Sequence, residues 1–159
     1  MPRNSALRRY LSRPVLNSAL TKDCGRDVLL VEVLPVADGQ RWSLRFEHVD
    51  PRWPAGVWFA VDGELLVGGA RSPQMVIWTH AAPPVLEIEI VSAADGLLRL
   101  YNIWDSGRGI KPHESQAATS GMLKRERDDG CLEYRCNDFG LEPKFDRLLF
   151  VLCRETDEQ

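Results

Sequence analysis

The side chains best suited to chemistry gather in one long polar segment, residues 105–120. It brings carboxylate, hydroxyl, guanidinium and imidazole groups close together, the mixture that hydrolases use for proton transfer and that binding sites use for polar contacts. A loop this long on a rigid sheet often carries function, although the same composition suits a mobile, solvated connection. We predict a ligand- or partner-binding set made of Trp53, Trp104, Asp105, Arg108, His113 and Glu114.

Motifs that define an enzyme are absent from the sequence. It contains no Gly-rich phosphate loop, no nucleophile elbow, no paired-histidine helix and no zinc-ligand spacing. His113 and Glu114 are neighbours, but adjacency alone does not make a catalytic dyad. We therefore predict no catalytic residue, no metal and no cofactor. A hydrolase in which His113 acts with Glu114, Asp105 or Cys131 stays open as a less favoured reading.

Three classes of function fit this pattern. We favour a non-catalytic binding or regulatory domain that docks a protein partner through a sheet face or the long loop, since that needs no catalytic motif. The alternative is a carbohydrate- or small-ligand-binding domain in which an exposed Trp53, Trp58 or Trp104 forms a stacking platform. The third is a hydrolase that uses residues 105–115. Only Trp53 lies in a predicted loop, and tryptophans on strands are usually buried.

Composition and charge set the broad class. The chain has 159 residues, 44% of them hydrophobic, which is enough for one domain with its own core. The first 22 residues carry five basic side chains and no acid, so the rest is acidic and is not expected to bind nucleic acid. No run approaches the roughly 20 apolar residues of a membrane helix, and no secretory signal follows the basic start. We expect a soluble, cytoplasmic protein without membrane contact, and its oligomeric state stays open.

The four cysteines are spread along the chain, at Cys24, Cys131, Cys136 and Cys153. Cys131 and Cys136 lie five positions apart in a predicted strand, which places their side chains on opposite faces. That geometry argues against a joint metal site or a mutual disulfide. We interpret all four as structural or spare thiols, with Cys131 accessible and Cys136 and Cys153 protected.

Residues 1–23 are predicted to form a basic, helical segment. Asn4 or Ser5 could cap a short helix in which Leu7, Tyr10 and Leu11 share a face. The favoured interpretation packs this helix on a single β-domain formed by residues 24–159. A basic, acid-free start also suits a targeting segment or a free arm for an acidic partner.

From residue 27 onward the apolar pattern is that of strands. Residues 41–49 alternate apolar and polar side chains and place His48 on the apolar side, where a histidine is usually a hydrogen-bonded core or rim residue. Residues 50–56 hold two prolines and are predicted to form a loop. Asp-Gly pairs begin at positions 38, 62, 95 and 129 and supply turn residues. The pattern predicts an all-β fold, an antiparallel β-sandwich or flattened barrel of about ten short strands with a short N-terminal helix.

Two of these Asp-Gly pairs are predicted to form the turns of β-hairpins in the middle of the chain. Residues 84–107 form the central one, and its second run, 97–104, is apolar on both faces as in an interior strand. Residues 57–68 form another, with Phe59 opposite Leu66.

Charge selects the register of the last hairpin. A two-residue loop would place Glu126 opposite Glu133, two like charges. A three-residue loop at residues 128–130 instead places Arg125 opposite Glu133, and we predict this one. The run 145–153 that follows is apolar on both faces along much of its length, so we expect it to be a central strand.

Overall fold

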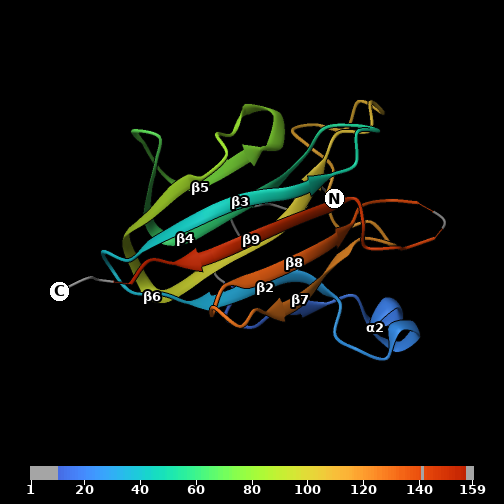
Figure 1. Cartoon of the computed structure of the whole chain (residues 1–159), viewed down its shortest axis with the longest axis horizontal. Helices are drawn as coiled ribbons and strands as arrows, with labels where there is room; N and C mark the ends of the chain where they lie inside the picture. The colour runs from blue at the N-terminus through green and yellow to red at the C-terminus, as the bar shows by residue number, and fades with distance from the viewer. Residues whose placement is uncertain (1–10, 141, 157–159) are drawn as a thin grey trace.

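The computed structural model describes residues 11–140 and 142–156. Among these residues most of the regular structure is strand, which confirms the all-β prediction (Figure 1). The elements are β1 (Val15–Leu16), α2 (Ser18–Cys24), β2 (Leu29–Pro35), β3 (Arg41–Val49), β4 (Ala55–Val67), β5 (Ala70–Trp78), the 3-10 helix η1 (Thr79–Ala81), β6 (Leu86–Trp104), β7 (Gly121–Glu126), β8 (Leu132–Asn137) and β9 (Leu148–Arg154).

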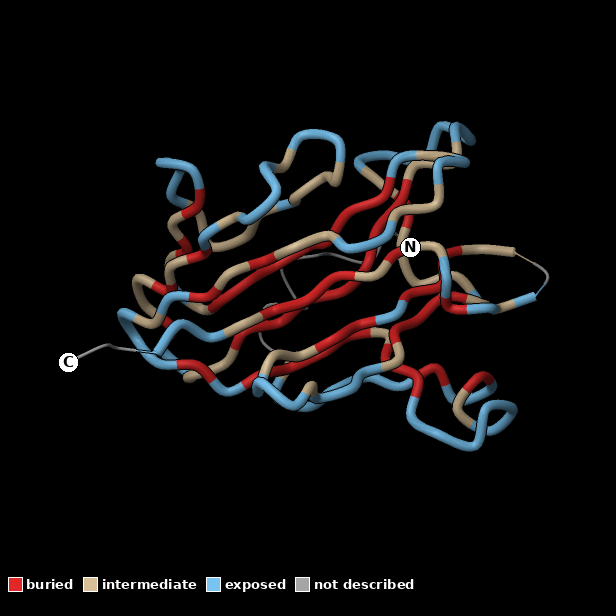
Figure 2. Tube along the Cα trace, in the orientation of Figure 1, coloured by how far each residue is buried: buried red, intermediate tan, exposed pale blue. Residues whose placement is uncertain are grey.

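Six antiparallel strands close into a ring, in the order β2, β7, β8, β9, β3 and β6, and β6 pairs back with β2. Strands β4 and β5 extend the sheet beyond β6, and β1 pairs with β2. Buried residues follow the strands, while exposed residues concentrate in the connections (Figure 2). The ring is therefore a packed scaffold, and its loops are the parts open to partners.

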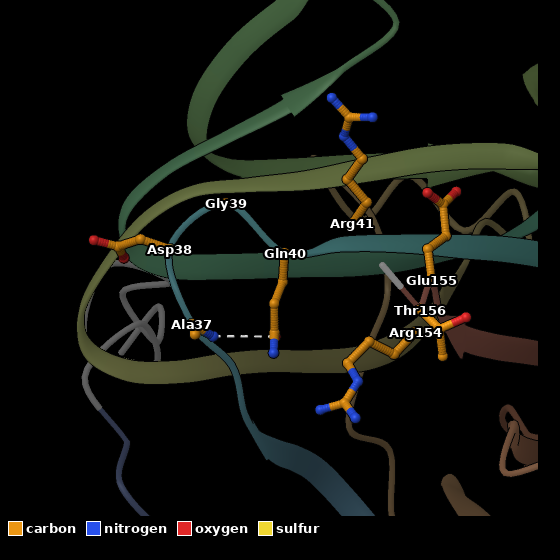
Figure 3. A pocket seen from close by; sticks show the side chains of 8 residues that line it. All are labelled: Ala37, Asp38, Gly39, Gln40, Arg41, Arg154, Glu155 and Thr156. Atoms are coloured by element: carbon orange, nitrogen blue, oxygen red, sulfur yellow. Dashed lines mark hydrogen bonds between the residues drawn. The ribbon is translucent and has the colours of Figure 1, made fainter. Parts of the chain in front are cut away.

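The expected hairpins within β4 and β6 are wrong in their pairing. Each strand bends at its Asp-Gly pair, but its two halves pair with the neighbouring strand instead of with each other. Phe59 lies opposite Leu100, and Leu66 lies opposite Glu89. The ribbon of β6 curves around the turn that joins β2 to β3 (Figure 3). Because β4 and β6 bend at the same level, each half finds its hydrogen-bond partners in the adjacent strand.

The predicted register of the last hairpin is confirmed. Arg125 lies opposite Glu133 and Met122 opposite Cys136, and Gly130 takes the left-handed conformation with a φ of 85°. The final strand, β9, lies between β8 and β3, and Phe150 and Val151 are fully buried. Its expected central position is therefore also confirmed.

The expectation for His48 is wrong, because the alternation of β3 does not continue to its end. Trp42 and Leu44 are buried as predicted, but the pairing of β3 with β9 shifts between Phe46 and His48. A bulge of this kind adds one residue and changes the face to which later side chains point. His48 is consequently exposed.

Two of the four cysteines form a disulfide, Cys131–Cys153, so the interpretation of both as thiols is wrong. Strands β8 and β9 pair with Leu132 opposite Leu152. Cys131, just before Leu132, therefore lies opposite Cys153, just after Leu152, and their Cα atoms are 4.5 Å apart. The sequence spacing gave no sign of this contact because it depends on which strands are neighbours. Cys136 is a buried thiol, as expected, and Cys24 is an exposed one.

The N-terminal helix expected near Asn4 and Ser5 falls largely outside the described residues. The described helix is α2, which Asn17 caps by accepting a hydrogen bond from the backbone N–H of Leu20 at 3.1 Å. The Asn17 side-chain amide also donates to the carbonyls of Ala118 and Ser120, each at 2.9 Å. This segment is thus tied to the connection between β6 and β7. No described helix is both long and apolar enough to cross a membrane.

Candidate functional site

Three connections meet at one end of the strand ring, at the right of Figure 1: β3–β4, β6–β7 and β8–β9. Hydrogen bonds tie them to one another. The backbone N–H of Asp105 donates to Pro54 O at 3.0 Å, that of Asp50 to Arg147 O at 2.8 Å, and the Asn137 side chain to Thr119 O at 2.6 Å. The long polar connection is therefore anchored at its start and near its end.

Two arginines and two aromatic rings form a continuous series of contacts at this end, which we call the loop-end stack: Arg52, Trp53, Phe139 and Arg108. The Arg52 Cζ lies 4.6 Å from the centroid of the Trp53 ring. The rings of Trp53 and Phe139 stack with centroids 5.2 Å apart and an interplanar angle of 11°. The Arg108 Cζ lies 3.9 Å from the Phe139 centroid. Side chains from all three connections thus share one set of cation–π and ring-stacking contacts.

The buried carboxylate of Glu114 fixes the position of Arg108. Its side chain is 3% exposed and accepts a hydrogen bond from Arg108 Nε at 2.8 Å, as part of an ion pair with the guanidinium. The Ser106 backbone N–H donates to its other carboxylate oxygen. Burial alone would raise the pKa of Glu114, but the hydrogen bonds from Ser106 and the contact with Arg108 outweigh it, so the pKa lies below its ordinary value. Glu114 is therefore a charged anchor at neutral pH.

The carboxylate of Asp138 lies beneath Trp53. It is 4% exposed, and its Oδ2 accepts a hydrogen bond from Trp53 Nε1 at 2.7 Å. Its Oδ1 accepts none from a described residue, since Arg147 Nε is 3.6 Å away, beyond hydrogen-bonding distance. Burial raises the pKa of Asp138 to about 6, and the charges of Asp50 and Glu114 act in the same direction. The stack thus covers a carboxyl that titrates near neutral pH.

Of the six residues singled out in the sequence, the structure brings three together. Trp53 and Arg108 belong to the loop-end stack, and Glu114 lies directly below it. Asp105 has a local role, because its side chain accepts a hydrogen bond from the backbone N–H of Gly107 at 2.9 Å and shapes the start of the connection.

The other two have different surroundings. Trp104 is 1% exposed, so its ring is part of the interior and offers no platform, and Trp58 is buried in the same way. The ring centroid of His113 lies 6.3 Å from that of Tyr101, a buried residue of β6.

Sequence reasoning missed Arg52, Phe139 and Asp138. Phe139 carried a usable signal, because it is an aromatic residue beside Asp138 and Gly140 in a predicted loop, the same context that drew attention to Trp53. Arg52 directly precedes that tryptophan. Which loops meet depends on strand order, and strand order was not predicted.

One group of the hydrolase reading, the Cys131 thiol, is not free in the structure. Cys131 is bonded to Cys153 and lies where β8 begins, whereas the loop-end stack lies where β8 ends. Within residues 11–140 and 142–156, no group of three or more His, Cys, Asp or Glu side chains is arranged to hold a metal ion.

A second polar region lies at the other end of the ring, between the β2–β3 turn and the end of β9 (Figure 3). This hollow has a volume of ≈ 840 Å³. The side chains of Arg41 and Arg154 extend in opposite directions from it, and Gln40 accepts a hydrogen bond from the backbone of Ala37 at 3.0 Å. Its charged groups do not converge on a common point, so it is a weaker candidate than the loop end.

No protein-family model matches this chain, and neither a curated protein nor a solved structure matches it. The chemistry and geometry of the loop end are therefore the basis for a functional proposal.

Proposed function

We propose that the protein is a non-catalytic binding domain that docks a protein partner on the loop-end stack. The observation that carries this proposal is the stack itself, in which Arg52, Trp53, Phe139 and Arg108 join three connections at one end of a rigid strand ring. Loops held by a rigid scaffold are the usual place for recognition.

The residue types of the stack suit an interface. Tryptophan and arginine are enriched among the residues that dominate binding energy at protein–protein contacts. The side chains of Arg52 and Arg108 are 41% and 48% exposed, so a partner can reach them. Because the rings and the Glu114 ion pair already order these groups, docking would lose less side-chain entropy than it would at free arginines.

The same groups indicate the chemistry of the partner. Arg52 Nη2 lies 3.9 Å from Asp50 Oδ2, too far for a hydrogen bond, so this guanidinium can donate to an incoming carboxylate. Trp53 and Phe139, which lie between the two arginines, are partly exposed, and the edges of their rings offer a small apolar area. A partner segment that carries acidic and apolar side chains would complement this surface.

Two features favour docking over catalysis or sugar binding. Glu114 is ionised and engaged by Ser106 and Arg108, which leaves it poorly suited to donate a proton. The Trp53 ring already contacts Phe139 and Arg52, which reduces the ring area left for a sugar. Both features follow from the stack.

The test compares proteins retained from a lysate of the source cells by the immobilised full chain and by variants. Phe139→Ala combined with Arg108→Ala removes half of the stack, and Arg41→Ala removes an exposed arginine at the other end of the ring. We expect one or more proteins that the parent chain and Arg41→Ala retain and the double variant loses. A retained set that is identical for all three chains would contradict the proposal, provided that the melting temperatures agree.

A further inference from the structure

Strands β2 and β7 share the shortest pairing among the described strands of the ring. These strands pair at Leu29 opposite Met122, and no other described residues extend their pairing. The next inward-facing position on β7 is Lys124, which lies opposite the buried Tyr134 of β8. Cross-strand partners share a face of a sheet, so the Lys124 side chain leaves the backbone on the interior side of the ring. A lysine on an inward face departs from the usual pattern, and such departures concentrate at functional sites.

A buried carboxylate fixes this lysine where β2 and β7 meet. Glu32 of β2 is 2% exposed, and one of its oxygens accepts a hydrogen bond from Tyr134 Oη at 2.7 Å and lies 2.9 Å from Lys124 Nζ. Burial raises the pKa of Tyr134 well above its usual range, so the hydroxyl stays protonated and donates. The Lys124 side chain is 38% exposed, which leaves part of its ammonium open to solvent.

A concavity of ≈ 700 Å³ lies over this group, a size that suits a small molecule. Its lining includes the apolar side chains of Pro14, Leu16 and Leu29 and the charged side chains of Arg13, Arg26 and Asp27. Arg26 Nη2 is held by the carbonyl of Lys124 at 3.2 Å. The Arg13 side chain is exposed and makes no hydrogen bond or ion pair with another described residue, so a ligand can reach its guanidinium.

We propose that this concavity binds a small organic anion, a carboxylate or sulfonate carried on an apolar ring or chain. The anionic group would lie against Lys124 and the two arginines, and the apolar body would cover Leu16 and Leu29. The lining of the concavity holds three cations and two carboxylates, so it keeps one net positive charge on a chain whose net charge is negative. This site is separate from the loop-end stack, so either proposal can fail without the other.

The experiment uses two fluorescent probes that differ in charge. 8-Anilinonaphthalene-1-sulfonate carries a sulfonate, and N-phenyl-1-naphthylamine has nearly the same apolar body without it. Each is titrated against the full chain and three variants. Arg13→Met and Lys124→Met remove a cation from the concavity, and Arg154→Met removes one from the hollow at the other end of the ring. Arg13→Met is the safer variant, since Lys124→Met leaves Glu32 buried without its partner.

We expect saturable binding of the sulfonate at one site per chain, with the neutral probe at least about 10-fold weaker. Arg13→Met and, where it stays folded, Lys124→Met should weaken sulfonate binding about 5-fold or more and leave the neutral probe unchanged. Arg154→Met should bind like the parent. Absence of saturable binding, equal affinity for both probes, or a parent-like affinity of Arg13→Met would each overturn the proposal.

Discussion

Two buried carboxyls, Glu133 and Asp138, titrate in opposite directions because their hydrogen-bond donors differ. Glu133 is 2% exposed and accepts from Arg125, Arg135 and Arg127, and these donors lower its pKa to about 2 despite its burial. Asp138 has one neutral donor, Trp53 Nε1, and burial raises its pKa to about 6. The identity of the donors decides which carboxyl is charged in the folded protein.

The Asp138→Asn variant should become more stable relative to the parent as pH rises. A folded-state pKa of about 6 lies above the ordinary value of 3.8, so the folded parent holds a proton that the unfolded chain releases, and its stability falls between about pH 4 and pH 7. The difference between variant and parent should grow by about 1–2 kcal/mol over that window, allowing for solvent screening. Urea unfolding at pH 4.5 and pH 8 measures it. A difference that does not change with pH would show that Asp138 titrates normally.

The Glu133→Gln variant should lose stability at neutral pH. The neutral amide cannot balance three guanidinium groups, and we expect a cost of about 1–2 kcal/mol, since Arg125 and Arg135 remain largely solvated. The carboxylate contributes above pH 4.5, and its contribution disappears as pH falls toward 2, so the cost should shrink at pH 3. Arg125→Gln, which removes one of three donors, serves as the control and should cost less. Equal stability of Glu133→Gln and parent in urea at pH 7 would contradict this interpretation.

Among the strands, local patterns predicted what local forces determine. Alternation located most strands, and charge pairing selected the β7–β8 register because both strands belong to one short hairpin. The Asp-Gly pairs of β4 and β6 indicated where each strand changes direction, but not which strands pair with its two halves. Their halves pair with neighbouring strands through contacts that are distant in sequence. The same limit hid the Cys131–Cys153 disulfide, which depends on β8 lying beside β9.

Thiol chemistry tests the placement of β8 beside β9. Under native, non-reducing conditions a maleimide should label Cys24 rapidly, and after unfolding it should also label Cys136, for two thiols in all. Prior reduction should raise the number labelled in the unfolded chain to four, the total in the sequence. Four labelled thiols without reduction would contradict the disulfide. The cytoplasmic location stays a prediction, and a disulfide is more usual in oxidising compartments.

At the scale of the whole molecule, the strand ring brings distant loops to one end. Trp53, Arg108 and Glu114 were identified in the sequence by residue type and loop context. Their meeting with Phe139 could not be predicted, because it depends on the strand order that places the β8–β9 connection beside the other two. A docking surface at this end requires the β6–β7 connection to be ordered before a partner binds.

Hydrogen exchange of two backbone amides tests that claim most directly. The N–H of Ser106 donates to the Glu114 carboxylate, and the N–H of Glu114 donates to Trp104 O at 2.9 Å. In the folded parent both amides should exchange at least about 100-fold more slowly than in an unstructured peptide. Arg108→Ala should speed exchange at Ser106 and leave the amide of Tyr134 in β8 unchanged. Exchange of Ser106 and Glu114 at the unstructured rate in the parent would contradict the account, because a docking surface would then not exist before the partner binds.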